Sequence, residues 1–521
     1  MKNRLFILVA ASFALAGCSD KFLTVEPSGG TLSEDQFSKL ENTVSSSVSG
    51  VYSNMYAYGA HDWFGQRSID LKTDILSGDI ALTGVTYGWF GTDCMMLTSS
   101  YNTGDFWTYY YEIIHSANVI LHSLDLTSDV NKKVDEYGLP SSENEKQFSD
   151  QDLIDGGYYA EMYAMRAYAY LGLVKVYSEP YDEIPDPSKR LCVPLYNADN
   201  HLSTEAQGLS SVDDVLTMIE SDLNLAVEYF DAFKPTRENK LHIDVNVARG
   251  LLAQAYLTHL DYNHAYEVAK KVIEDGAYTI LPNSELLTTG FCDVNHKSWM
   301  WGQDVDVETT TALGSFWGQV DIHTYSYAQA GDVKAIDETL LNSIPEWDGR
   351  KRWFITDKSS KYYGAPDRKF YNLSSANTTE ASEVDRNWLN DNIFMRIESV
   401  YLTAAEAALL KDPQDLGEAE KYLTAITDER IDTAATAADA YAEYKASLSG
   451  NDKALREAVE YNWRVEMWGE GYGLQTFRRL TKSKKRGGNH YYYSGQEVNS
   501  SDAYFTFERP TSEDNYNPNI D

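Results

Sequence analysis

Five charged residues near the C-terminus recur at a spacing that could bring them together along one helix. They are Arg464, Glu466, Glu470, Arg478 and Arg479. Carboxylates beside arginines can carry out acid–base chemistry, but at helical spacing oppositely charged side chains more often form ion pairs. We therefore expect these residues to hold the last helix against its neighbours rather than to catalyse a reaction.

Catalysis has little other support in the sequence. A tethered glycan hydrolase would need two carboxylates about 5–9.5 Å apart, and the 79 acidic residues supply chance candidates without marking any one pair. Neither a GxSxG nucleophile turn nor an HExxH zinc helix occurs. The alternating acids Asp304, Asp306 and Glu308 lack the glycine that turns a calcium loop. We predict no catalytic residue, no metal and no cofactor, and keep the hydrolase as the less favoured alternative.

The N-terminus carries an export signal that ends in a cysteine. Basic residues precede an apolar run from Leu5 to Leu15, which is much shorter than the roughly 20 residues of a membrane-spanning helix. The run leads into Leu15-Ala16-Gly17-Cys18, which looks like a bacterial lipobox. In such signals the peptidase cuts before the cysteine, which is then acylated. We therefore predict removal of residues 1–17 and lipidation of Cys18, with an ordinary secreted protein as the alternative.

The chain is strongly acidic. Its 44 basic and 79 acidic side chains give a formal net charge of −35, which repels phosphate backbones and anionic lipid surfaces. We therefore expect no nucleic-acid partner. Beyond Cys18, the cysteines are too few and too scattered for a disulfide framework, and we expect buried free thiols at Cys94, Cys192 and Cys292.

Helical periodicity dominates the chain. Apolar residues from Val212 to Phe230 recur at the spacing of one helix face, directly after a capping Ser211. Small and aromatic residues over 252–269 follow the offsets of a tetratricopeptide helix pair, and a second pair is expected over 407–426, divided at Pro413. Further helices are expected over 105–124, 158–177 and 453–468.

Long segments between these helices are rich in Gly, Ser, Thr, Asn and Tyr. Loops of this length in a compact protein are commonly functional or disordered, and their aromatic content argues against disorder. We expect loops with a few short strands there, one of them Trp299-Met300-Trp301 with alternating faces. The segments are 78–104, 141–156, 290–331, 362–388 and 482–521.

A motif close to the C-terminus points to a family. Residues 463–472 read WRVEMWGEGY, and residues 477–480 read FRRL. This resembles the SusD/RagB family, whose terminal helix reads roughly RRxELWGEGF followed by DLxRL; here Trp463 replaces one arginine and Thr476 the usual acid. Other stretches occur in the family's order: RAY at 166–168, WDGR at 347–350, MRIE at 395–398 and Asn517-Pro518.

The resemblance implies a mainly α fold in which tetratricopeptide-type helix pairs pack against an irregular, loop-rich lobe. We expect one SusD-like globule over residues 18–521, with an N-terminal part over about 18–235 and a C-terminal SusD/RagB part over about 236–521. Members of this family are lipid-anchored in the outer membrane and face the cell exterior. They bind a nutrient, commonly a glycan, and deliver it to a SusC-like TonB-dependent transporter.

Aromatic residues in the loops are the expected ligand contacts, because sugar C–H faces stack on rings and sugar hydroxyls need planar donors and acceptors. Two glycine-flanked segments, 86–90 and 316–327, match the family's ligand-facing regions, and two further polar side chains could supply hydrogen bonds. The predicted ligand-binding residues are Tyr87, Trp89, Trp317, Tyr325, Tyr327, Asn102 and Arg67. A peptide or another nutrient stays open as the ligand, and a broad charged groove would favour it.

Overall fold

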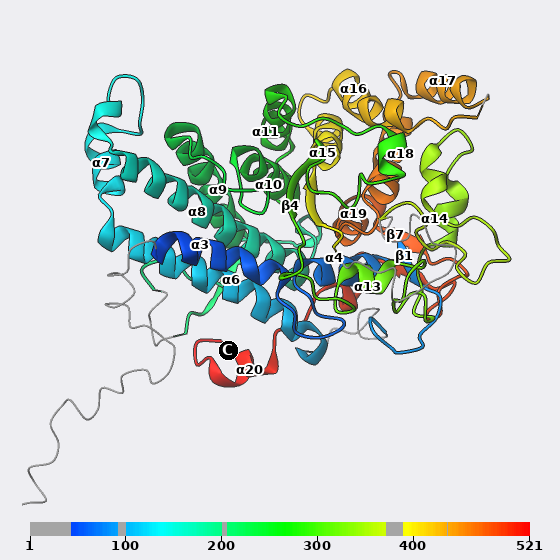
Figure 1. Ribbon diagram of the computed structural model, residues 1–521, viewed down its shortest axis with the longest axis horizontal. Coiled ribbons are helices and arrows are strands. Elements are labelled where there is room, and N and C mark those ends of the chain that lie inside the picture. The colour runs from blue at the N-terminus through cyan, green and yellow to red at the C-terminus, as the bar shows by residue number, and fades with distance from the viewer. Residues whose placement is uncertain (1–42, 92–99, 201–205, 371–388, 435, 521) are drawn as a thin grey trace, which may run out of the picture. The chain divides into compact units, whose positions relative to one another are not determined.

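The computed structural model describes residues 43–91, 100–200, 206–370, 389–434 and 436–520. The chain divides into two compact units, residues 1–47 and residues 48–521. Helices dominate the second unit (Figure 1), and the strands described form four two-stranded antiparallel sheets. This confirms the mainly α fold with few short strands. Among the described residues, no helix combines the length and apolarity that a membrane crossing requires.

Three long helices pack side by side in the N-terminal half of the chain. Helix α8 (Asp150–Tyr177) lies between α6 (Ser100–Thr127) and α9 (Val212–Phe233), as Figure 1 shows. The expected cap of α9 is confirmed, since the Ser211 side chain accepts a hydrogen bond from the backbone N–H of Asp214.

Helix α8 begins before the expected position, so the predicted loop over 141–156 is partly wrong. Ser149 and Asp152 form a reciprocal capping box that starts the helix at Asp150. Gly156 lies inside the helix, where a Cβ atom would come within 2.3 Å of the Phe233 ring. The glycine therefore marks a close approach of α8 to α9 and not a turn.

The two predicted helix pairs are confirmed. The first consists of α10 (Val245–Thr258) and α11 (Tyr262–Asp275), and the second of α15 (Ile397–Leu410) and α16 (Leu416–Thr427). Helix α11 packs on α15, so the two pairs are adjacent although more than a hundred residues separate them in the sequence. Buried small residues allow this close packing: Ala253, Ala265, Ala269, Ala404 and Ala408.

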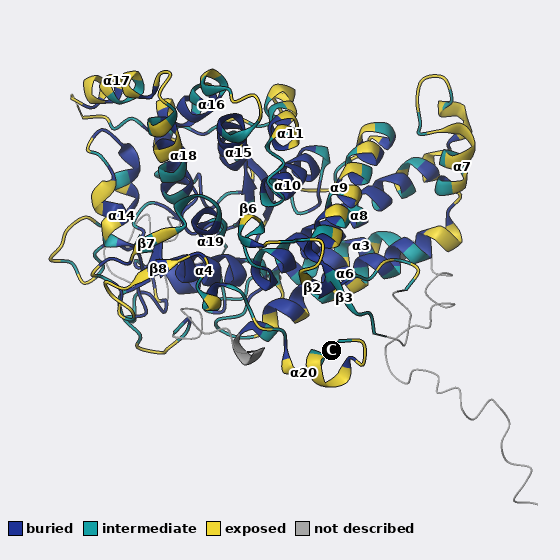
Figure 2. Ribbon diagram, turned by 180° about the vertical axis from the view of Figure 1, so that it is seen from behind, coloured by how far each residue is buried: buried dark blue, intermediate teal, exposed yellow. Residues whose placement is uncertain are grey.

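A short buried helix anchors the C-terminal segment. Helix α4 (Gln66–Ser77) is buried along nearly its whole length, polar residues included (Figure 2). Its Asp74 carboxylate accepts hydrogen bonds from the backbone N–H groups of Gly471 and Gly473 at 3.1 and 2.7 Å. These bonds tie α4 to the turn between α18 (Asp452–Glu466) and α19 (Gly473–Thr476).

Two of the sheets matter for the site. Strand β1 (Ile80–Leu82) pairs with β5 (Lys334–Ile336), which brings the loop after β1 beside the loop before β5. Strand β4 (Trp299–Gln303) pairs with β6 (Asn392–Arg396) and confirms the predicted strand, but both of its faces are buried. The indole N–H groups of Trp299 and Trp301 donate to the carbonyls of Gly290 and Leu241.

The remaining elements are short or lie at the surface. Figure 2 shows exposed residues along α7 and α17, whereas α4 is dark. The sheets not yet described are β2 (Leu191–Pro194) with β3 (Leu209–Ser211), and β7 (Ser483–Lys485) with β8 (Glu497–Asn499). The helices are α3 (Thr43–Ser53), α7 (Val130–Tyr137), α12 (Asn283–Leu286), α13 (Phe316–Val320), α14 (Glu338–Ser343), α17 (Ala437–Leu448) and α20 (Thr511–Tyr516).

The cysteine predictions can be checked at two positions. Cys192 and Cys292 are buried free thiols, as expected, and burial raises the pKa of each thiol to about 12. Cys18 and Cys94 lie outside the described residues.

Candidate functional site

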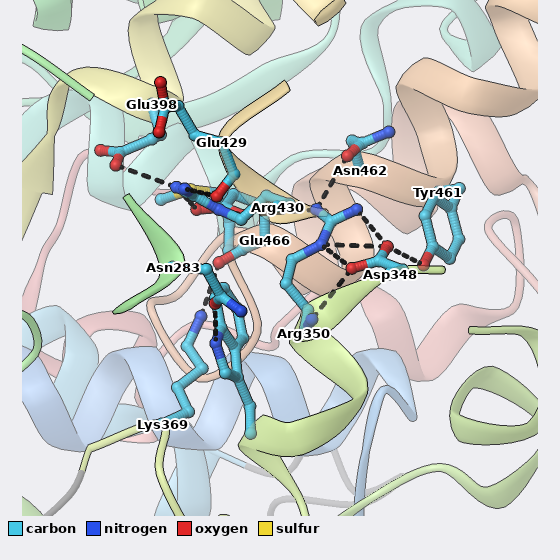
Figure 3. A network of polar contacts seen from close by, with 12 residues as sticks. Asn283, Asp348, Arg350, Lys369, Glu398, Glu429, Arg430, Tyr461, Asn462 and Glu466 are labelled. Atoms are coloured by element: carbon cyan, nitrogen blue, oxygen red, sulfur yellow. Dashed lines mark hydrogen bonds and ion pairs between the residues drawn. The ribbon is translucent and has the colours of Figure 1, made fainter. Parts of the chain in front are cut away.

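Glu466 of the C-terminal motif belongs to a buried network that Figure 3 shows from close by. Glu466 has no exposed surface and receives hydrogen bonds from Arg350, Arg396 and Arg430 at 2.9–3.2 Å. Burial alone would raise the pKa of Glu466, but the three guanidinium groups hold it well below its usual range. Because the three arginines come from separate segments, Glu466 joins those segments in the core.

Most of the other charged residues of the motif also form ion pairs that join segments of the fold, as the sequence predicts. Arg396 pairs with Glu470 at 2.9 Å, and Arg479 donates to Glu406 at 2.8 Å. Arg478 differs, because among the described residues it pairs with no carboxylate and donates instead to the carbonyl oxygens of Lys175 and Ser178 at the end of α8. Helix C-termini leave such carbonyls without intrahelical partners.

Five aromatic side chains from three loops are in ring contact at the surface, and Tyr325 lies two residues from one of them, Tyr327. We call these six residues the ring cluster. Tyr327 lies at its centre, with ring centroids 5.2 Å from Tyr87, 6.0 Å from Trp89 and 5.5 Å from His61. His61 also lies 5.3 Å from Trp89. The members of the ring cluster are Tyr58, His61, Tyr87, Trp89, Tyr325 and Tyr327.

The ring cluster presents exposed rings around a buried centre. Tyr58, Tyr87 and Tyr325 are 51%, 57% and 41% exposed, whereas Tyr327 is 9% exposed. Burial raises the pKa of Tyr327, and the neighbouring tyrosines raise it further, so its hydroxyl stays protonated at neutral pH. The cluster therefore offers ring faces together with phenol hydroxyls, which are both donors and acceptors.

Buried polar groups hold the loops of the ring cluster in place. The Asp332 carboxylate accepts hydrogen bonds from the backbone N–H groups of Thr86 and Tyr87, and its own N–H donates to the carbonyl of Tyr327 at 2.8 Å. Helix α13 supports the other side, because the Gln319 amide donates to the carbonyl of His61 at 2.7 Å. These contacts join loops that are up to 258 residues apart in the sequence.

A glycine allows Tyr58 to lie against the loop before α13. A Cβ atom at Gly314 would come within 2.2 Å of the Tyr58 ring. Any larger residue there would displace the ring, so the glycine helps to set the edge of the cluster.

The structure brings four of the seven predicted residues together in the ring cluster: Tyr87, Trp89, Tyr325 and Tyr327. Asn102 lies in the first turn of α6, and its side chain is outside the described set.

The remaining two predicted residues are buried and offer no ligand surface. Trp317 is 4% exposed, and its ring packs against Phe316 and Phe370 in the core. Arg67 is 2% exposed; its guanidinium donates to Asp70 at 2.7 Å and to the carbonyl of Gly469 at 2.9 Å. Both were expected at the surface, and tertiary packing makes them structural instead.

Tyr58 and His61 were missed by sequence reasoning. They belong to the segment YAYGAHDW at 56–63, an aromatic run that contains a glycine, as the segment around Tyr87 does. The criterion that selected residues 86–90 would have selected this run as well.

A pocket away from the ring cluster is too small for an oligosaccharide. It has a volume of about 110 Å³ and lies between α4, α8 and α10. Asp70, Lys175 and Gln254 line it, and none of the ring-cluster residues does. A cavity of this volume suits a few water molecules.

No group of three or more His, Cys, Asp or Glu side chains within the described ranges is placed to hold a metal ion. The acidic stretch at 304–308 forms a local turn, in which the Asp306 carboxylate accepts hydrogen bonds from the backbone N–H groups of Glu308 and Thr309, both at 2.9 Å.

Comparison with known families gives the class of this protein. Residues 22–257 match a family described as starch-binding and associating with the outer membrane, and residues 354–519 match the SusD family. Together with the helix pairs and the buried C-terminal motif, these matches establish that the chain belongs to the SusD family.

Solved structures share this fold over nearly the whole chain. A SusD-like carbohydrate binding protein from Bacteroides vulgatus is 20% identical, with a TM-score of 0.69 over 92% of this chain and 96% of its own. A SusD superfamily protein from Bacteroides thetaiotaomicron is 18% identical, with a TM-score of 0.67 over 92% and 98%. One from Bacteroides fragilis is 18% identical, with a TM-score of 0.66 over 93% and 99%. No curated protein matches the chain.

Proposed function

We propose that this protein is a cell-surface lipoprotein that captures an oligosaccharide or polysaccharide on the ring cluster and delivers it to a SusC-like TonB-dependent transporter. The observation that carries the proposal is the convergence of six aromatic side chains from three loops, three of them more than 40% exposed. The family description as starch-binding and the carbohydrate-binding relative from Bacteroides vulgatus support a glycan as the ligand.

The geometry of the ring cluster suits a sugar chain. Tyrosine and tryptophan rings are rigid and amphipathic, so they receive the C–H face of a sugar at little cost in side-chain entropy. The backbone around Tyr87 and Tyr327 is held by Asp332, which further reduces the ordering needed on binding. Each sugar unit binds weakly, and several units bound together raise the affinity through effective concentration.

Binding without cleavage agrees with how one carboxylate beside the ring cluster is used. Asp332 reaches the ring cluster but is 1% exposed, and its oxygens accept backbone hydrogen bonds from Thr86 and Tyr87. A glycosidase needs two carboxyl groups that face the ligand. Asp332 is occupied in positioning the loop and does not face outward.

Membrane attachment and delivery complete the proposal. The lipobox-like segment ending at Cys18 supports a lipid anchor, and the family description supports association with the outer membrane. Bacterial lipoproteins of this kind carry several acyl chains, which anchor far more firmly than one chain does. Membership of the SusD family supports a SusC-like partner.

The test is electrophoresis of the mature chain through native gels that contain a panel of polysaccharides. We expect at least one polysaccharide to retard the wild type, and Tyr87→Ala/Trp89→Ala to remove that retardation with little change in the thermal midpoint. The matched control is Tyr516→Ala, because Tyr516 is 85% exposed on α20 and outside the ring cluster. Unchanged retardation of the double variant would show that the ring cluster is not the binding site. Binding of peptides in place of glycans would show that the ligand is not a glycan.

A further inference from the structure

A segment beside the ring cluster has a net positive charge, opposite in sign to that of the chain. The protein as a whole carries a net charge of −35. The segment 351–368 instead has more basic than acidic residues: Lys351, Arg352, Lys358, Lys361 and Arg368 against Asp357 and Asp367. The segment therefore differs in charge from the average of the chain, and it does so beside the proposed ligand surface.

This basic segment is continuous with the ring cluster. The Tyr362 hydroxyl donates a hydrogen bond of 3.2 Å to the carbonyl of Gln329, which is two residues from Tyr327. Tyr362 also packs against the small apolar cluster of Ile322, Ala328 and Val333 beneath the loop that carries Tyr325 and Tyr327. A ligand chain lying across the ring cluster can therefore continue over Tyr362.

Two lysines of the segment lie over tyrosine rings. The Lys361 ammonium is 4.5 Å from the centroid of the Tyr362 ring, and the Lys358 ammonium is 5.9 Å from that of Tyr363. Cation–π contact holds a flexible lysine near a ring face. Both lysines are exposed, so their remaining N–H groups are open to a ligand.

Within the described part of the chain, neither Lys358 nor Lys361 forms an ion pair with a carboxylate. The two neighbouring acids bond elsewhere: Asp357 accepts from the backbone N–H and hydroxyl of Ser359, and Glu338 accepts from the N–H of Gly488. Other exposed lysines do have carboxylate partners, such as Lys189 with Asp186 and Lys421 with Glu418. The pair over the tyrosines is thus available to an anion from outside.

We infer that the ligand is an acidic glycan, whose sugar rings stack on the ring cluster while carboxylate groups of uronic acid units reach Lys358 and Lys361. This inference rests on the proposed function and narrows its ligand class. At physiological salt the screening length is about 8 Å, so the distant negative charge of the protein is screened while the two lysines act at contact distance. Because salt also weakens the attraction between the lysines and the carboxylates, we expect the affinity to fall as salt is added.

The experiment measures binding of the mature chain to polygalacturonate, to dextran sulfate and to neutral polysaccharides, each at about 20 and about 200 mM salt. We expect polygalacturonate to bind, and added salt to weaken it at least threefold. Lys358→Glu/Lys361→Glu should lower that affinity at least tenfold without lowering the thermal midpoint. The control Lys189→Glu/Lys453→Glu makes the same change in net charge at lysines that are 81% and 86% exposed elsewhere, and should bind nearly as the wild type does.

Each other outcome has a definite meaning. Ring-dependent binding of neutral polysaccharides alone would overturn the acidic ligand and leave the proposed function standing. Equal losses of affinity in the Lys358→Glu/Lys361→Glu variant and in its control would show that only the net charge matters. That result would overturn the role of Lys358 and Lys361. Preference for dextran sulfate, which carries sulfates and no carboxylates, would overturn the carboxylate as the recognised group. Binding of vesicles with anionic lipid, and of no polysaccharide, would contradict both the inference and the proposed function.

Discussion

The Asp332 carboxylate accepts a hydrogen bond of 2.9 Å from the backbone N–H of Tyr87, a residue 245 positions earlier in the chain. The backbone N–H of the same aspartate donates to the carbonyl of Tyr327 at 2.8 Å. One buried side chain thus sets the spacing between the two tyrosine rings, whose centroids are 5.2 Å apart. Strands β1 and β5 bring the loops together, and Asp332 fixes their relative position.

Replacing Asp332 by Ala should loosen the ring cluster. Hydrogen bonds to a charged acceptor each contribute about 1.5–3 kcal/mol, and their loss lets the Tyr87 loop move. We expect ligand affinity to fall about tenfold, as for a loss of about 1.4 kcal/mol. Faster hydrogen exchange at the Tyr87 amide should accompany this loss. Asp306→Ala is the control, since within the described ranges the Asp306 carboxylate accepts hydrogen bonds from Glu308 and Thr309 of its own loop. An unchanged affinity in Asp332→Ala would contradict a positioning role.

Trp89 and Trp317 should respond differently to truncation. Trp317→Ala removes a core ring and should destabilise the fold by about 3–5 kcal/mol. Trp89 is half-buried within the ring cluster, so Trp89→Ala should cost less stability and more ligand affinity. Urea unfolding and ligand titration of both variants measure the contrast. Loss of affinity in Trp317→Ala with full stability would restore Trp317 as a ligand contact.

Glu466→Gln should destabilise the fold without touching the ligand surface. Removing the charge leaves three buried arginines without their shared carboxylate, which costs about 3–5 kcal/mol. Glu460→Gln is the control, because its pair with Arg464 is partly exposed and long at 3.6 Å, so about 0–1 kcal/mol is expected. Urea unfolding gives both values. A Glu466→Gln protein as stable as the control would contradict the architectural role of the network.

Asp337 should make stability fall in acid. Burial alone would raise its pKa, but hydrogen bonds from His490 and from the backbone N–H groups of Gly487 and Leu340 lower it to about 2, from an ordinary value of 3.8. The folded state therefore binds this proton less readily than the unfolded state does. The contribution is complete above about pH 4 and is lost as the pH falls toward 2.

The difference between wild type and Asp337→Asn isolates this effect from the other carboxylates. We expect the variant to be less stable at pH 7 and the gap to close between about pH 4 and 2. Thermal unfolding across that range gives the gap at each pH. A gap that stays constant from pH 7 to 2 would show that the Asp337 pKa is not lowered.

Local patterns in the sequence predict much of the helical scaffold. The periodicity after Ser211 predicts α9 with its cap, and the small residues over 252–269 predict the first helix pair. The start of α8 is missed because Gly156 suits both a turn and a close helix contact. The contact with Phe233, on another helix, is what distinguishes the two cases.

The candidate site is less predictable, because burial is decided by distant partners. Tyr87 and Trp317 lie in similar glycine-flanked segments, yet one is exposed and the other is packed against Phe370. Nothing local distinguishes them. Likewise, Arg67 donates both to Asp70 on its own helix and to the carbonyl of Gly469, 402 residues away; no spacing rule reaches the second partner.

The central claim is that a glycan binds on the ring cluster, and a crystal structure of the mature chain with a bound oligosaccharide tests it most directly. We predict sugar rings stacked on Tyr87, Trp89 and Tyr325, with sugar hydroxyls within hydrogen-bond distance of the tyrosine hydroxyls. An oligosaccharide bound at another surface, with these rings free of ligand, would contradict the account.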